Sequence, residues 1–72
     1  KMLTGWFVDN GKWYYADNSG AMLRDTVAII NGKRYIFDWD GVAMKGYTSA
    51  KDGNGVYSLY YIDNNWNSEV LG

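Results

Sequence analysis

Residues 10–15 read Asn-Gly-Lys-Trp-Tyr-Tyr, and residues 31–36 read Asn-Gly-Lys-Arg-Tyr-Ile, so one pattern returns 21 positions later. Each copy begins with Asn-Gly, the preferred pair for a two-residue hairpin turn, because both central residues of that turn need a positive φ. Apolar and aromatic runs flank both pairs, at residues 6–8, 12–16, 26–30 and 33–37. The sequence therefore predicts two β-hairpins.

The similarity between the two copies extends beyond the hairpins. Gly20-Ala21-Met22 is matched by residues 41–44, and Gly5-Trp6 is matched by Gly46-Tyr47. A period of about twenty residues is typical of repeat architectures, in which a unit buries its apolar face only by stacking on its neighbour. We expect one module over residues 1–72, with repeat 1 at about 4–23, repeat 2 at about 24–44 and a degenerate terminal repeat at about 45–72.

The connecting segments and the third unit have their own signals. Residues 17–20 and 38–41 are turn-forming segments whose Asp side chains are expected to bond local backbone groups. In the third unit the spacing changes, because Tyr60-Tyr61 follows Tyr35-Ile36 by 25 positions. Residues 56–62 are the longest strand candidate, and the Asn-rich tail at 63–72 is expected to cover the last hairpin.

Composition narrows the fold and the chemistry. Gly 9, Pro 0 and an aromatic content of 18% favour an all-β, turn-rich chain, and no stretch shows a helical apolar period. With Cys 0 and His 0 there is no disulfide, no Cys or His zinc site and no imidazole base. We therefore expect no cofactor, no metal and no enzyme activity in this chain. The two Asp-rich turns at 38–41 and 52–55 lack the ligand spacing of a calcium loop.

Charge and hydropathy narrow the partners. Seven Lys and Arg against eight Asp and Glu give a net charge of -1 with no basic cluster, which argues against nucleic acid. No apolar run has the length of a membrane span, so membrane insertion is not expected. Residues 1–4 carry no apolar signal segment, and any export signal is expected outside this piece.

Several of these residues together resemble a known family. Thr4-Gly5-Trp6, residues 11–15 and residues 20–22 resemble the cell-wall-binding repeat of choline-binding surface proteins and phage lysins. Residues 30–38 are also similar to repeats of glucan-binding regions and of large clostridial toxins. The resemblance covers roughly residues 4–47. It implies a left-handed β-solenoid of stacked hairpins that attaches a parent protein to a bacterial surface polymer.

The resemblance also implies a ligand site in the cleft between consecutive hairpins. In the choline-binding branch the ligand is held by the Trp of a Gly-Trp pair, the Trp of Trp-Tyr-Tyr, an aromatic residue of the next hairpin and often a Met. Carried over to this sequence, these positions are Trp6, Trp13, Tyr35 and Met22. A quaternary ammonium cannot donate a hydrogen bond, so aromatic faces are its best protein partners.

The second unit departs from the family pattern. Arg34 stands where the second repeat should carry Trp, and Val27 stands where it should carry the ring of the Gly-Trp pair. Arg34 would repel choline, although it is suited to pair with a phosphate of the same teichoic acid chain. A second candidate site is therefore sought in the third unit, where it groups Tyr47, Tyr60, Tyr61 and Trp66.

Every one of these rings also has a purely structural interpretation. Tyr14, Tyr15, Tyr35 and Phe37 are favoured as core residues, because the chain has few large aliphatic side chains. For Trp6 and Trp13 the core and the ligand interpretations are balanced, and methionine is more often a gap-filler than a ligand contact. The sequence leaves open whether Trp39 and Trp66 are stacking platforms for sugar or clamps under a loop.

The leading interpretation is a non-catalytic cell-wall-binding module, extracellular on a Gram-positive wall, that recognises choline on teichoic acid. Its parent would be a surface protein, an autolysin or a phage endolysin, with any active site elsewhere in that protein. One alternative is a carbohydrate-binding or glucan-binding repeat that stacks sugars on its rings. Another is a structural repeat that acts as a spacer or a homodimer contact.

Overall fold

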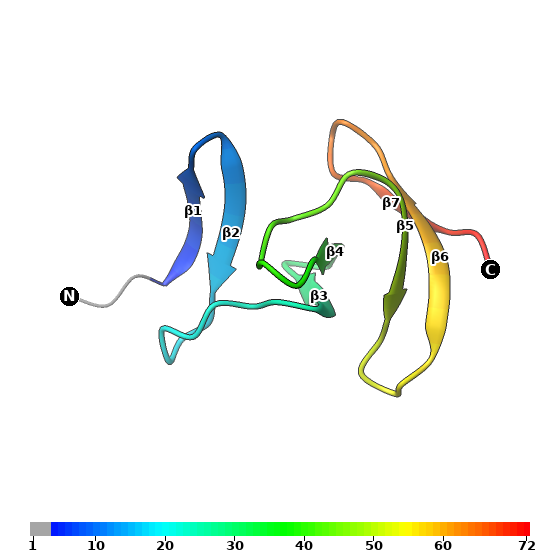
Figure 1. The fold of residues 1–72 in the computed structure, drawn as a ribbon, viewed down its shortest axis with the longest axis horizontal. Coiled ribbons are helices and arrows are strands. Elements are labelled where there is room, and N and C mark those ends of the chain that lie inside the picture. Colours follow the sequence, from blue (N-terminus) through cyan, green and yellow to red (C-terminus); the bar gives the residue numbers. More distant parts are fainter. Residues whose placement is uncertain (1–3) are drawn as a thin grey trace.

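The structure, a computed structural model, describes residues 4–72 and consists of antiparallel β-hairpins arranged in series (Figure 1). The strands are β1 (Gly5–Asp9), β2 (Lys12–Ala16), β3 (Thr26–Ile30), β4 (Lys33–Phe37), β5 (Gly46–Lys51), β6 (Tyr57–Ile62) and β7 (Ser68–Val70). The all-β hairpin fold predicted from the sequence is confirmed. The predicted module and the N-terminal segment without a signal also include residues 1–3, which lie outside the described residues. Within residues 4–72, no helix is long and apolar enough to cross a membrane.

Hairpin 1 (β1 and β2) and hairpin 2 (β3 and β4) form at the two Asn-Gly pairs. Asn10 and Gly11 have φ of 53° and 74°, and Asn31 and Gly32 have φ of 53° and 81°. These positive values define the two-residue turn that Asn-Gly favours, because its twist matches that of the flanking strands. Both hairpins therefore form where the sequence predicts them.

Hairpin 3 (β5 and β6) has a longer loop and an additional strand. A five-residue turn from Asp52 to Val56 joins β5 to β6 in place of a two-residue turn, which accounts for the longer spacing in this unit. The short strand β7 pairs with β6, from Tyr60–Val70 to Ile62–Ser68. The sequence did not predict β7, because a three-residue Ser-Glu-Val strand is too short to show an alternating pattern.

Four five-residue turns share one hydrogen-bonding pattern, and we call each of them an Asp turn. In each one, Oδ1 of the first residue accepts hydrogen bonds from the amides two and four positions later, at 2.8–3.1 Å. The amide three positions later donates to the carbonyl of the same Asp at 2.9–3.1 Å. The Asp turns begin at Asp17, Asp38, Asp52 and Asp63. Three of them end a hairpin and direct the chain toward the next element.

A buried spine runs along the inside of the stack. Ala16, Phe37 and Ile62 close the second strand of each hairpin, immediately before an Asp turn, and are 3%, 2% and 1% exposed. Ile36 and Tyr60 are buried beside them. Ile36 of unit 2 packs with Tyr60 and Ile62 of unit 3 in one core cluster, as stacking of repeats requires.

A main-chain hydrogen bond joins the first two units, and the hairpins turn about the long axis. The amide of Ala43, in the segment after β4, donates to the carbonyl of Trp13 in β2 at 2.9 Å. In Figure 1, β3 and β4 are seen nearly end-on, whereas the strands of hairpins 1 and 3 lie along the view plane. The result is an elongated body of 40 × 26 × 22 Å, with hairpin 1 and β7 toward opposite ends.

Candidate functional site

Four aromatic side chains line a cavity of about 300 Å³, which we call the aromatic cavity. They are Trp6, Trp13, Tyr35 and Trp66. Trp6, Tyr35 and Trp66 are half-buried, and Trp13 is 43% exposed. The structure thus brings together three of the four residues predicted as the first site, and adds a fourth ring from the third unit.

The register of hairpin 1 places Trp6 and Trp13 on one face of the sheet. Trp6 pairs with Tyr15, and Val8 pairs with Trp13, so the two indoles are diagonal neighbours across the strands. Their ring centroids are 6.4 Å apart with an interplanar angle of 79°. This edge-to-face arrangement is favoured by the quadrupoles of the rings. Hairpin 1 alone therefore supplies one corner of the aromatic cavity.

Hairpin 2 supplies the third ring, Tyr35, and packs two of its aromatic side chains against Trp6. The centroid of Tyr35 lies 4.7 Å from that of Trp6 at an interplanar angle of 64°, and Phe37 lies 5.9 Å from Trp6 on the spine side. The hydrogen bond from Ala43 to Trp13 fixes the main chain of β2 against the same unit. Trp6 is consequently packed at the junction of the two hairpins.

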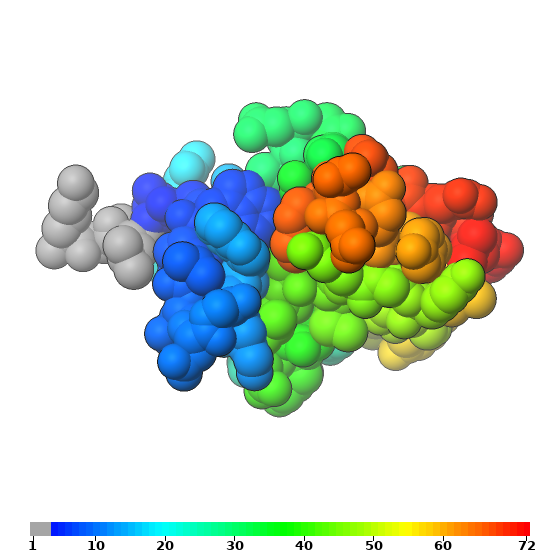
Figure 2. Space-filling model, turned by 90° about the horizontal axis from the view of Figure 1, so that it is seen from above, coloured from blue at the N-terminus to red at the C-terminus, as the bar shows by residue number. Residues whose placement is uncertain are grey.

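The fourth ring comes from the last Asp turn. Trp66 has a φ of 68°, and its ring centroid lies 6.1 Å from that of Tyr35. In a space-filling view this turn, drawn in orange, lies against hairpin 1, drawn in blue (Figure 2). A left-handed conformation costs a residue with a Cβ roughly 1–2 kcal/mol relative to the right-handed region. Trp66 therefore adopts a backbone conformation that is unfavourable for a residue with a large side chain.

Two lysines contact this turn. Nζ of Lys33 donates a hydrogen bond to the carbonyl of Asn65 at 3.0 Å, and Nζ of Lys45 lies 4.3 Å from the centroid of the Trp66 ring. The amide of Asn67 donates to the Asp63 carboxylate and, with weaker help from Asn65 and Lys33, holds the pKa of Asp63 below its usual value. The turn that carries Trp66 is thus fixed at its carboxylate, its backbone and its ring.

The chemistry of the aromatic cavity follows from its lining. Four rings offer π faces and apolar area, and no charged side chain is among the residues that line the cavity. Each ring can contribute roughly 0.5–2 kcal/mol to a cation, depending on desolvation. A primary ammonium would give up hydrogen bonds with water on entering, whereas a quaternary ammonium has none to give up. The cavity is suited to a methylated cation.

Met22 lies elsewhere. It forms an isolated bridge with Ala16 in the segment between hairpins 1 and 2 and is not among the residues lining the aromatic cavity. Its methyl group lies so close to Gly41 that a Cβ on that glycine would approach it to 2.8 Å. Met22 thus fills the space above a glycine in the next Asp turn.

The residues expected as a second site are distributed over three environments. Tyr60 is buried in the core, and Trp66 belongs to the aromatic cavity. Tyr47 and Tyr61 are cross-strand partners in hairpin 3, with ring centroids 4.8 Å apart, and both are exposed. The structure does not bring the four together.

The cleft between hairpins 2 and 3 carries different residues at the equivalent positions. By the register of the hairpins, the counterparts of Trp6, Trp13 and Tyr35 in this cleft are Val27, Arg34 and Tyr60. The Cζ atom of Arg34 lies 5.5 Å from the centroid of the Tyr60 ring. An internal guanidinium therefore lies over the ring that corresponds to Tyr35.

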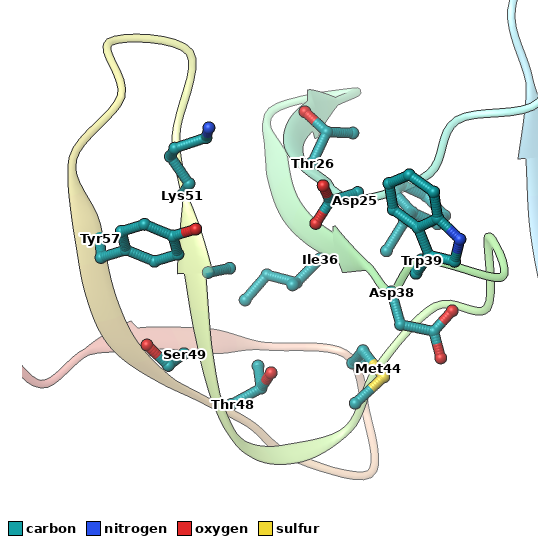
Figure 3. Close-up of a pocket in the computed structure, with 12 residues that line it drawn as sticks. Asp25, Thr26, Ile36, Asp38, Trp39, Met44, Thr48, Ser49, Lys51 and Tyr57 are labelled. Carbon is teal, nitrogen blue, oxygen red and sulfur yellow. The ribbon is translucent and has the colours of Figure 1, made fainter.

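A second cavity, of about 200 Å³, differs in polarity (Figure 3). Asp25, Thr26 and Trp39 lie on one side of it, and Lys51 and Tyr57 lie on the opposite side. The guanidinium of Arg24 covers the Trp39 ring at 4.8 Å from its centroid. Among the described residues, 4–72, no three potential metal-ligating side chains are gathered to hold an ion. This cavity offers hydroxyl, carboxylate and ammonium groups beside the rings of Trp39 and Tyr57.

Sequence reasoning placed Trp66 in the wrong environment because the spacing of the third unit is irregular. The available signal was Asp63, which precedes Trp66 by three residues, as Asp17 precedes Gly20 and Asp38 precedes Gly41. Alignment on these aspartates places Trp66 at the glycine position of an Asp turn. This alignment would have shown that residues 63–67 repeat the turn pattern of the first two units.

This chain matches one protein-family model and several solved structures. The family model of a cell wall binding repeat, of the choline-binding type, matches residues 4–22. The choline binding domain of Spr1274 from Streptococcus pneumoniae is 34% identical with a TM-score of 0.60, over 61% of this chain and 67% of that domain. No curated protein sequence matches significantly.

Two longer structures match over nearly the whole chain. Choline binding protein F from Streptococcus pneumoniae is 28% identical with a TM-score of 0.62, over 96% of this chain and 28% of that protein. A pneumococcal cell wall endolysin from phage Cp-1, complexed with choline, has a TM-score of 0.59 over 94% of this chain and 24% of that protein. Its identity is 22%, so it is similar in fold alone. The chain thus spans about a quarter of these two proteins.

Proposed function

Since this chain belongs to the choline-binding type of cell wall binding repeat family, whose members are non-catalytic binding modules, we propose that it anchors a parent protein to choline-bearing teichoic acid of a Gram-positive wall. The parent would be a surface protein, an autolysin or an endolysin that acts outside the cell. Residues 1–72 would serve as one module of two regular repeats and a modified terminal repeat.

The aromatic cavity is the observation that carries this proposal. Trp6, Trp13 and Tyr35 supply rings from two consecutive hairpins, and Trp66 faces them from the last Asp turn. We assign the trimethylammonium group of choline to this cavity, and we leave Met22 out of the contact set because it does not line it.

One such site binds weakly. Four rings at roughly 0.5–2 kcal/mol each give about 2–8 kcal/mol in all, a range centred near the roughly 4.1 kcal/mol of a 1 mM Kd, so we expect a Kd on the order of 1 mM. In the cleft between hairpins 2 and 3 the Arg34 guanidinium lies over the Tyr60 ring, where it would repel a second cation, so we expect one choline per chain. A polymer with many choline groups would compensate for this weakness through effective concentration when several modules are linked.

A calorimetric titration of the chain with choline tests the proposal. We expect saturable binding with a stoichiometry of one and a rise in Tm on adding choline. Trp13→Ala should weaken binding about tenfold, because it removes an exposed wall that the fold needs little. Trp39→Ala is the matched control, because Trp39 is exposed and lies outside the aromatic cavity.

The second cavity, which lies beside Asp25, Thr26 and Trp39, supports glycan binding as the second candidate function. Hydroxyl and carboxylate groups beside the exposed Trp39 are the partners that a sugar ring uses. If a wall polysaccharide binds and loses affinity with Trp39→Ala while choline gives no response, the glycan function replaces the choline function. A choline response that is equally lost with both Trp variants would also contradict our assignment of the site.

A further inference from the structure

The Asp turns of this chain differ at one position that bears on the aromatic cavity. Gly20, Gly41 and Gly55 occupy the fourth position of three Asp turns, with φ of 85°, 89° and 83°. Trp66 occupies the same position of the fourth turn, with a φ of 68°. The four turns nevertheless share the same hydrogen bonds to the Oδ1 atom and the carbonyl of their first Asp. A strained residue that persists in a turn designed for glycine points to a role for its side chain.

We propose that Trp66 is the specificity-determining residue of the aromatic cavity: its π face makes the cavity selective for a quaternary ammonium. This inference rests on the proposed choline function and names the residue that sets its selectivity. Without Trp66, three rings from hairpins 1 and 2 remain, and the side facing the last Asp turn has no wall.

The position of Lys45 supports this role. Its ammonium lies 4.3 Å from the centroid of the Trp66 ring, so the ring already attracts a cation in the absence of ligand. The hydrogen bond from Lys33 to the carbonyl of Asn65 holds the preceding peptide in place. The fourth wall is thus fixed before the ligand arrives, which lowers the ordering cost of binding.

Packing is the competing explanation for Trp66. Its side chain also lies against the core cluster of Ile36, Tyr60 and Ile62. Any apolar side chain of suitable size would fill the space against that cluster. Among apolar side chains, only an aromatic one has a face that attracts a cation. The two roles therefore predict different results for an aliphatic and for an aromatic replacement.

The test compares Trp66→Leu with Trp66→Phe, because both keep a Cβ at the same φ and both can fill the core. Calorimetry measures the Kd of each for choline and for 3,3-dimethyl-1-butanol, the neutral carbon isostere of choline. We expect Trp66→Phe to bind choline within about threefold of the wild type. We expect Trp66→Leu to lose about tenfold in choline affinity and little in affinity for the neutral isostere.

Equal choline affinities for the Leu and Phe variants would overturn the inference while leaving the proposed function intact. Failure of the wild type to bind choline would overturn both. Circular dichroism establishes that each variant is folded under the titration conditions. If neither variant folds, Trp66→Gly removes the ring and restores the residue that the other three Asp turns carry. Choline affinity of that variant equal to the wild type would also overturn the inference.

Discussion

Lys45 is a like charge beside the proposed cation site. Its exposed ammonium lies over the Trp66 ring and helps to position that ring. The same ammonium would repel a cationic ligand bound to the ring. Two unit charges about 8 Å apart repel by roughly 0.5 kcal/mol in water, and by more where solvent is excluded. Because the Lys45 ammonium is exposed to solvent, we expect the repulsion to stay near roughly 0.5 kcal/mol.

We therefore expect Lys45→Gln to tighten choline binding about two- to threefold, and added salt to narrow the difference from the wild type by screening the repulsion. The readout is calorimetric Kd at two salt concentrations. Lys51→Gln is the control, since Nζ of Lys51 lies 6.0 Å from the centroid of the Tyr57 ring and outside the aromatic cavity. Weaker binding by the Lys45 variant would instead show that this lysine is needed to position Trp66.

Two Asp residues link pH to the turns that they begin. Hydrogen bonds from Ser19, through its side chain first, and from Ala21 lower the pKa of Asp17, and the amide of Asn67 is the main cause of the lowered pKa of Asp63. A carboxylate with a lowered folded-state pKa stabilises the fold above its unfolded pKa, and this stabilisation is lost as pH falls through the folded value.

We expect Tm to fall as the pH drops below about 4, and choline affinity to fall with it, because protonated Asp63 holds the Trp66 turn less firmly. Asp63→Asn keeps an oxygen acceptor but does not titrate, and should flatten the pH dependence of binding. Asp17→Asn should flatten part of the Tm profile only, since its turn lies away from the cavity. A pH profile of choline affinity that is unchanged in Asp63→Asn would contradict this link.

At the scale of the elements, hairpin 2 differs from hairpin 1 in what it presents to the next unit. Hairpin 1 presents Trp6 and Trp13, whose rings line the aromatic cavity, whereas hairpin 2 presents Val27 and Arg34 at the equivalent positions. The Arg34 guanidinium over Tyr60, which is 4% exposed, replaces an external cation with an internal one. Under the proposed function, the same repeat position serves binding in one unit and stability in the next.

Arg34→Met keeps an unbranched apolar side chain and removes the charge. We expect it to lower the free energy of unfolding by about 1 kcal/mol, which in a chain of this size lowers Tm by roughly 4–8 °C. Arg24→Met removes the guanidinium over the exposed Trp39 and should cost about half as much or less. Equal losses in thermal melts of the two variants would mean that burial of Tyr60 does not strengthen the Arg34 contact.

The elements that the sequence predicts well are those set by local chemistry. Asn10-Gly11 and Asn31-Gly32 require positive φ, so the turn, the register and the face of each ring follow from a few neighbouring residues. The grouping of Trp6, Trp13 and Tyr35 follows once the hairpins stack. Trp66 was not placed, because the loop from residue 52 to 56 shifts the third unit out of period. A tertiary contact between units one and three has no local signal.

At the scale of the whole molecule, the stack is unequal at its two ends. The aromatic cavity lies where hairpin 1 meets the last Asp turn, while hairpin 3 exposes Tyr47, Leu59 and Tyr61. The homodimer expected from the sequence stays a prediction. Under the proposed function, a chain with one weak site would depend on several linked modules for firm attachment.

The closure of the cavity by Trp66 has a consequence for how such an array can change length. Repeat proteins commonly gain or lose whole units by duplication and deletion, because each unit contacts only its neighbours. Here one site joins a residue of the first unit to a residue of the third. Insertion of another unit between hairpins 2 and 3 would carry Trp66 away from Trp6. If the aromatic cavity is the ligand site proposed above, we therefore expect the order and number of the three units to be kept together wherever that site is kept.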